Sequence, residues 1–181
     1  MQFNSIDEIF ETAEAVRKET LGFAGSITPE ESGVLADGET WTLRSIFEHM
    51  ALVDDRILWV VDKIAAKADS MPRADGKIPL AISDSFGSTL GKFASEKLVA
   101  PETVQPTGEI PIADSILRLE DSLAALAALR EGLENADLTK HRIPHPYLGE
   151  LTAPEWMVIR NGHEERHVSQ ARVILDKIRQ K

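Results

Sequence analysis

Cysteine is absent from the 181-residue chain, which excludes disulfide bonds, thiolate metal sites and cysteine nucleophiles together. Any metal ion must therefore bind to histidine, carboxylate or backbone oxygen ligands. The sequence also lacks an apolar stretch near the roughly 20 residues that a membrane-spanning helix needs. The N-terminal segment is acidic by Asp7 and has no apolar block long enough for a signal peptide. We therefore expect a cytoplasmic protein with no membrane partner.

Basic residues are outnumbered, with 20 Lys and Arg against 30 Asp and Glu, which gives a net charge of −10. Binding to nucleic acid needs a basic face, so we expect no nucleic-acid partner. The charge is uneven: residues 152–181 carry six basic and four acidic side chains, and residues 1–151 carry fourteen and twenty-six. This distribution favours a cationic C-terminal helix packed among acidic helices over an anion-binding site. The length predicts a single domain over residues 1–181.

Two helices are expected in the first third of the chain. Ser5 and Glu8 form a capping-box pattern that begins the first helix, and apolar residues at helical spacing continue it to about Gly22. The second helix begins near Thr42, which is a suitable N-cap. The apolar stripe of this second helix includes His49, so we expect this imidazole to point into the core.

The remainder of the chain combines an irregular stretch with two further helices. Five prolines and four glycines in residues 69–111 exclude one continuous element, although a short helix is expected at residues 86–93. The third long helix follows this stretch and ends near Leu133. The fourth begins at a capping box, Thr152–Glu155, and continues to about Ile178. No β-hairpin pattern of convincing length is present. We therefore predict an all-α fold, a four-helix bundle with a long irregular connection between its second and third helices.

Three of the five histidines fall on the inward faces of two predicted helices. His163 and His167 are four residues apart, which places their Cβ atoms about 5–6 Å from each other on one helix face. His49 is the only other histidine so placed. Three neutral imidazoles with an open coordination position are typical of a catalytic site for one divalent ion, zinc or nickel first and iron or manganese as alternatives. The alternative is three hydrogen-bonded core histidines, which would need several compensating partners.

Residues 163–167 also match H-E-x-x-H, the motif in which a glutamate is the general base of a zinc peptidase. A peptidase is disfavoured, because only fourteen residues follow His167 and Asp176 is their only carboxylate to serve as a third ligand. No predicted strand is available to pair with an extended peptide. Glu164 is retained as the candidate catalytic residue beside the metal. The alternative is that this side chain is a solvated or supporting carboxylate.

Two blocks carry a resemblance to a known family. They are GETWTLRSIFEHM at residues 38–50 and HPYLGELTAPEWMVIRNGHEERHVSQA at residues 145–171. With the order of elements between them, the chain resembles the DinB-like (DinB/YfiT) superfamily of metalloenzymes over essentially its whole length. The resemblance implies a four-helix bundle that is usually a homodimer. It also implies a metal site whose ligands fall on His49, His163 and His167.

Characterised members of that superfamily include thiol S-transferases that use bacillithiol or mycothiol, and a maleylpyruvate isomerase. The resemblance therefore implies a small-molecule substrate, with a low-molecular-weight thiol as the first candidate. A divalent ion lowers the pKa of bound water to about 7 and deprotonates a coordinating thiol. The leading hypothesis is a metal-dependent enzyme that activates such a thiol for transfer, or water for hydrolysis. The alternative is a non-catalytic bundle that binds a metal or a small molecule.

Two residues outside the cluster are candidates for substrate binding. His145 lies in the turn before the fourth helix, and Trp41 lies just before the second. Both positions are expected near the mouth of a pocket at the metal. For Trp41 the alternative is ordinary aromatic packing at the end of the bundle.

Overall fold

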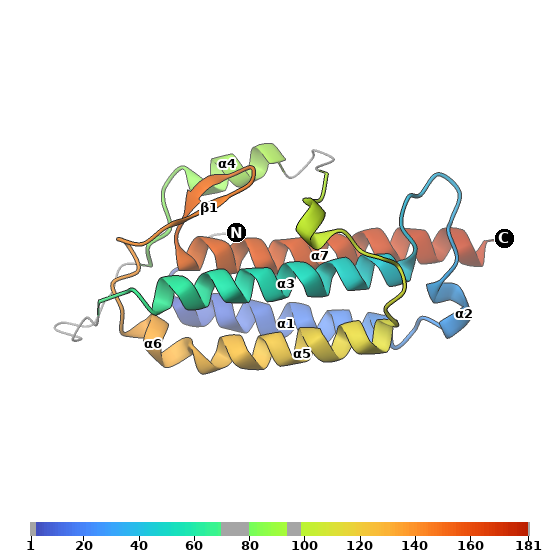
Figure 1. Ribbon diagram of the computed structural model, residues 1–181, viewed down its shortest axis with the longest axis horizontal. Helices are drawn as coiled ribbons and strands as arrows, with labels where there is room; N and C mark the ends of the chain where they lie inside the picture. Colours follow the sequence, from blue (N-terminus) through green and yellow to red (C-terminus); the bar gives the residue numbers. More distant parts are fainter. Residues whose placement is uncertain (1–2, 70–79, 94–98, 181) are drawn as a thin grey trace.

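The computed structural model describes residues 3–69, 80–93 and 99–180 and contains four long helices that lie side by side (Figure 1). Helix α3 packs against α5 and α7, and α1 packs against the same two helices, so the four form a closed ring. The expected all-α fold is confirmed. The bounds of the long helices are α1 Ile6–Ala24, α3 Leu43–Ala65, α5 Ile112–Ala128 and α7 Ala153–Arg179.

Side-chain caps begin three of these helices where the sequence predicts them. Thr42 Oγ1 accepts a hydrogen bond from the backbone N–H of Ser45, and Thr152 forms a complete capping box with the third residue of α7. Ser5 accepts from Glu8 N at 3.2 Å, but the Glu8 carboxylate returns to the backbone N–H of the residue before Ser5. In a complete capping box this second hydrogen bond would come from the backbone N–H of Ser5 itself, so the cap of α1 differs from a capping box by one residue. Helix α1 continues two residues beyond the expected end.

The third helix is shorter than predicted. Instead of continuing to Leu133, α5 ends at Ala128, and a separate short helix, α6 Arg130–Glu134, follows. At the junction the backbone N–H of Leu129 donates to the carbonyl of Leu126, three residues back, which tightens the turn and ends the regular α pattern.

The connection between α3 and α5 contains α4 Phe86–Phe93, as predicted, and a 3₁₀ helix, η1 Glu102–Val104. Two parts of the predicted connection, residues 70–79 and 94–98, lie outside the described residues. A further short helix, α2 Pro29–Ser32, precedes α3. Within the described ranges, no helix is both long enough and apolar enough to cross a membrane.

A short antiparallel hairpin, β1 Ile143–His145 and β2 Gly149–Leu151, precedes α7, so the expectation of no hairpin was wrong. Each strand has only three residues, too few for an alternating pattern to be visible. Gly149 has a φ of +78°, the left-handed conformation that lets the chain reverse direction. Trp156 Nε1 donates to the Ile143 carbonyl at 3.2 Å and joins the hairpin to α7.

The core has two apolar clusters, one toward each end of the bundle. On α1, α3 and α7, the side chains of the two clusters are separated along the helix by buried charged residues. A polar layer therefore crosses the bundle at mid-height. The charged side chains of this layer are less than 4% exposed and are Arg17, Asp54, Arg160 and Glu164.

The basic end of α7 packs among acidic side chains, as the uneven charge distribution predicted. Arg172 pairs with Glu19 at 3.0 Å, Lys177 pairs with Glu39 at 2.5 Å, and Arg179 pairs with Glu31 at 2.7 Å. These partners come from α1 and from the segment between α1 and α3. These three cations of α7 are thus paired with carboxylates of the same chain.

Candidate metal centre

The three predicted ligands lie together. His49 projects from α3 and is 4% exposed, and His163 and His167 project from successive turns of α7 and are half-buried. One ring nitrogen from each lies within 4.8 Å of the other two. In the described part of the chain, this group consists of three imidazoles without a fourth histidine or carboxylate. Helical spacing on α7 and the packing of α3 against it bring the rings together.

Hydrogen bonds at the far ring nitrogens orient two of the imidazoles. His49 Nδ1 lies 2.7 Å from the carbonyl of Val104, and His167 Nδ1 lies 2.9 Å from Oε1 of Gln170. Because both oxygens are acceptors, each Nδ1 carries the proton and each Nε2 keeps its lone pair. This is the arrangement of a metal-ligating histidine whose second nitrogen is held by a carbonyl. The donor set therefore fits a divalent ion.

The Nε2 atoms of His49 and His163 are 3.2 Å apart. The ring centroids of the three histidines are separated by 4.4 to 5.1 Å. Nitrogens that each hold a lone pair repel at such a distance unless a proton or a cation lies between them. The pair is satisfied either by a hydrogen bond from Nε2–H of His163 to Nε2 of His49 or by a cation that both nitrogens share.

Burial keeps these imidazoles neutral. It lowers the pKa of His49, despite the opposing effect of the bond to Val104. For His163, burial and then the neighbouring imidazoles hold the pKa well below the ordinary 6.5. The pKa of His167 is lowered to about 4, again chiefly by burial. Neutral imidazole is the form that coordinates a metal.

Glu164 lies in a different environment. Arg17 donates from Nε to Oε1 at 2.8 Å and from Nη2 to Oε2 at 2.9 Å, and the Thr20 hydroxyl donates to Oε1 at 2.6 Å. Burial raises the pKa of Glu164, but the hydrogen bond and charge of Arg17 outweigh it, and the net pKa is lowered. A carboxylate with both oxygens engaged by such donors is a weak base. The catalytic role of Glu164 stays a prediction, and these contacts do not support it.

Glu164 belongs to a charged network that joins all four long helices. Arg17 Nη2 also lies 3.3 Å from Asp54 Oδ2. Arg160 binds Asp54 from two nitrogens, at 2.6 and 2.9 Å, and Arg17 Nη1 donates to the Leu119 carbonyl of α5. Two cations and two anions therefore balance inside the core. Through Glu164, the residue after His163, the network fixes the position of α7 along the other helices.

Trp41 lies against the histidine cluster. Its ring centroid is 6.3 Å from that of His167, and the indole is half-buried. His145, in β1, contacts Trp156 with ring centroids 5.0 Å apart, and its Nδ1 accepts the backbone N–H of Tyr147 at 3.2 Å. Burial lowers the pKa of His145 to about 4. The structure therefore places Trp41 at the cluster and His145 in the hairpin beside α7.

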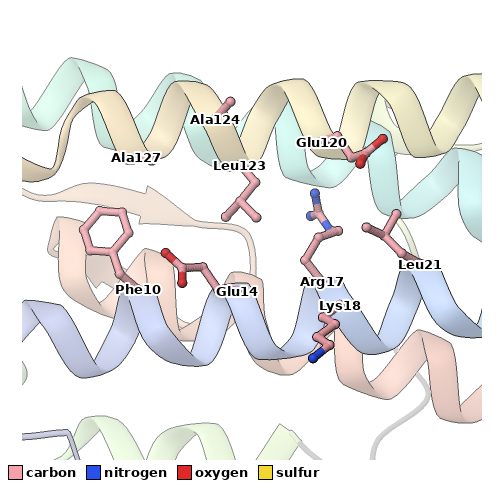
Figure 2. Close-up of a pocket in the computed structure, with 9 residues that line it drawn as sticks. All are labelled: Phe10, Glu14, Arg17, Lys18, Leu21, Glu120, Leu123, Ala124 and Ala127. Atoms are coloured by element: carbon pink, nitrogen blue, oxygen red, sulfur yellow. The ribbon is translucent and has the colours of Figure 1, made fainter.

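A hollow of about 410 Å³ lies elsewhere, between α1 and α5 (Figure 2). Its lining is mainly apolar, with Phe10, Leu21 and Leu123 among its side chains, and charged groups such as Lys18 and Glu120 at its edges. None of the three clustered histidines lines it. This hollow is therefore separate from the candidate metal centre.

Sequence reasoning missed several groups that support the cluster. The Val104 carbonyl leaves no sequence signal because every residue carries one. Gln170 follows His167 by three residues, a helical neighbour spacing that could have been noticed. Arg17 and Asp54 are charged residues on otherwise apolar helix stripes, and such an interruption is a signal for a buried ion pair.

A family model described as the DinB superfamily matches residues 12–171. The chain belongs to the DinB superfamily. It is 25% identical over 167 residues to the uncharacterized protein YuaE of Bacillus subtilis (strain 168), and the match covers 90% of this chain and 94% of that protein. No solved structure is a significant match. The resemblance that the two sequence blocks carry is thus confirmed, and membership in this superfamily fits a metal-binding protein with a three-histidine cluster.

Proposed function

We propose that this DinB-superfamily protein binds one divalent metal ion through Nε2 of His49 and His167 and through His163, and that it is a metal-dependent enzyme. The observation that carries the proposal is the convergence of three neutral ring nitrogens, within 4.8 Å of one another, on a common centre. The Nδ1 partners of two rings leave their Nε2 lone pairs available. Imidazole ligands suit zinc and nickel, and iron or manganese are alternatives.

The reaction class proposed first is transfer of a low-molecular-weight thiol to an electrophile, and the second is hydrolysis. The bound ion would supply Lewis acidity, which lowers the pKa of a thiol or water brought to it. With three protein ligands in the group, a tetrahedral ion would have one position for an outside molecule. The preference for a thiol comes from the superfamily, and the cysteine-free chain is compatible with an external thiol.

Trp41 and His145 are the proposed substrate-binding residues. The flat face of Trp41 beside His49 suits an apolar or aromatic part of a substrate. His145 Nδ1 accepts a backbone hydrogen bond, so the proton of the neutral ring lies on Nε2, which is then a donor. A substrate held between these two groups would present an acceptor toward the hairpin.

One observation favours a second candidate function. Glu164, the carboxylate that directly follows His163 in sequence, accepts hydrogen bonds from Arg17 and Thr20 and is not free to move protons. In the described ranges, no carboxylate joins the histidine group as a base. A non-catalytic protein that binds a metal or small molecule is therefore the alternative.

Metal analysis and a conjugation assay test both candidates. Elemental analysis of the purified protein is expected to find about one equivalent of zinc or nickel per chain.

The loaded protein is then incubated with a chlorinated aromatic and bacillithiol, mycothiol or glutathione. In the expected reaction a carbon–sulfur bond forms, the carbon–chlorine bond breaks, chloride leaves and the thiol proton goes to solvent. His49→Ala is the control. No conjugation with any of the three thiols would remove the transferase assignment and favour hydrolysis or binding alone.

A further inference from the structure

Glu48 is a buried carboxylate next to the candidate metal centre whose hydrogen-bond donors are neutral. It lies in α3 and is 3% exposed. Its Oε1 accepts from the backbone N–H and the hydroxyl of Thr107, both at 2.9 Å, and its Oε2 accepts from the backbone N–H of Gly108 at 2.7 Å. These donors belong to the segment between η1 and α5. A buried anion held by fixed backbone donors constrains both elements strongly.

The same segment meets α3 at three positions on one helix face. Ser45, Glu48 and His49 are related by three- and four-residue spacing, so they project from one side of α3. Gly108 has a φ of +76°, and a Cβ atom at this position would lie 3.0 Å from Ser45 Oγ. The backbone therefore approaches α3 too closely for a side chain at this point. We refer to residues 104–108 as the strap.

The strap carries the group that orients His49. The carbonyl of Val104 accepts from His49 Nδ1 at 2.7 Å, which fixes the proton on Nδ1 and leaves Nε2 directed at His163. Thr107, the partner of Glu48, is only three positions after Val104, so the chain between them spans at most about 10 Å. Release of Thr107 from Glu48 would therefore remove a restraint on the short segment that carries the Val104 carbonyl.

We propose that Glu48 is a positioning residue of the metal centre. By holding the strap on α3, it keeps the Val104 carbonyl on Nδ1 of His49 and so keeps the Nε2 lone pair available to the ion. This inference rests on the proposed metal site and adds to it the element that selects the tautomer of one ligand. Glu48 itself does not touch the ion in this role.

The test compares Glu48→Gln with a matched change, Glu155→Gln. Glutamine at position 48 turns one acceptor into an NH₂ group facing a donor of the strap, so the strap is released. Glu155 is also fully buried and accepts backbone N–H bonds, from Ser83 and Thr152, both at 2.9 Å, but it lies at the start of α7. It therefore controls for the loss of a buried carboxylate without loss of the strap.

Two readouts are made on the full chain. In chelated protein, ¹⁵N NMR of the histidine rings should show His49 protonated at Nδ1 in wild type and Glu155→Gln, and a tautomer mixture in Glu48→Gln. In competition titrations with zinc, Glu48→Gln should bind about tenfold more weakly, the usual effect of removing such support, whereas Glu155→Gln should match wild type. Thr107→Val removes only the hydroxyl donor, and it should give a smaller change in the same direction if Glu48→Gln folds poorly.

The outcomes separate the positioning role from a structural one and from failure of the metal site. A lower melting temperature in Glu48→Gln, with the wild-type tautomer and zinc affinity, would overturn the positioning role and leave Glu48 as a fold-stabilising residue. A wild-type protein that binds no divalent ion would overturn the proposed metal centre instead. In that case the NMR comparison still decides whether Glu48 controls the His49 tautomer, and an unchanged tautomer would overturn that too.

Discussion

The ring centroid of Trp41 lies 4.8 Å from that of His49, with an angle of 49° between the two planes. Trp41 immediately precedes Thr42, whose side chain caps α3, so the position of the indole is fixed by the start of the helix that carries the ligand. Of the chain's three tryptophans, Trp59 is 46% exposed and Trp156 lies under the hairpin. Trp41 is therefore an internal reporter of the metal centre.

Addition of zinc or nickel to chelated protein should change the tryptophan emission, because binding alters the charge on the imidazole beside Trp41. The change should saturate at about one equivalent. Trp41→Phe should lose most of it, and Trp59→Phe should retain it. The measurement is a fluorescence titration at pH 7.5. A wild-type response that Trp41→Phe keeps in full would show that the ion binds away from this indole.

His163→Ala should reduce the metal content to well below one equivalent per chain. The substitution removes one of three ligands, and the ring centroid of His163 lies 5.1 Å from that of His49 and 4.4 Å from that of His167. Elemental analysis after gel filtration is the measurement. His141→Ala, outside the group, is the control and should keep the metal of the wild type. Full occupancy in His163→Ala would remove this histidine from the site.

Arg17→Met should destabilise the fold by about 3–5 kcal/mol, because it leaves Glu164 and Asp54 as buried anions short of a partner. Urea denaturation of the chelated protein measures the free energy of unfolding without the contribution of a metal. Arg172→Met removes a half-exposed pair with Glu19 and should have little effect. Equal effects of the two substitutions would contradict a structural role for the buried network.

The protein is expected to be a homodimer, as is usual in the DinB-like superfamily. Large apolar side chains remain more than half exposed on the single chain, including Val99, Leu117 and Val173. Assembly would remove part of such surface from water. Light scattering at micromolar concentration should report twice the 20.0 kDa of one chain. A mass equal to one chain would contradict the expectation.

The helices and the histidine cluster could be predicted from the sequence because both depend on periodicity. Spacing placed His163 and His167 on one face, and the apolar stripe of α3 turned His49 inward. The H-E-x-x-H pattern was less informative about Glu164. A residue next to a ligand is rotated by about 100° around the helix. Glu164 therefore projects away from the ligands, and it pairs with Arg17 on α1.

The parts that were missed depend on long-range contacts or on backbone atoms. Whether Arg17 meets Glu164, 147 residues away, follows from the packing of α1 on α7 and not from local pattern. The Val104 carbonyl and the backbone donors that hold Glu48 belong to a connection that sequence alone showed only as irregular. The hairpin was missed because three-residue strands carry too little alternation.

The remaining prediction concerns the change in folding stability with pH. The direction of this change follows from the lowered histidine pKa values. Burial lowers the pKa of His145 and of His167 to about 4, whereas unfolded histidine has a pKa of about 6.5. Between these values the unfolded chain binds more protons than the folded one, so stability rises with pH across this window. The contribution is fully present above about pH 6.5 and is lost as the pH falls to about 4.

The chelated protein should therefore lose stability between pH 6.5 and 4, on the order of 1–3 kcal/mol for each such histidine. His145→Ala should flatten this part of the profile. The sequence alone indicates that zinc binding fails near pH 5, where a free imidazole is protonated. In the fold His167 is still mostly neutral at pH 5, so zinc should continue to raise the melting temperature there and fail only nearer pH 4. Urea and thermal denaturation at pH 7.5, 6, 5 and 4, with and without zinc, measure both effects. A zinc effect that vanishes by pH 6 would mean that the ligand histidines are as easily protonated as free imidazole, and that the buried cluster does not form.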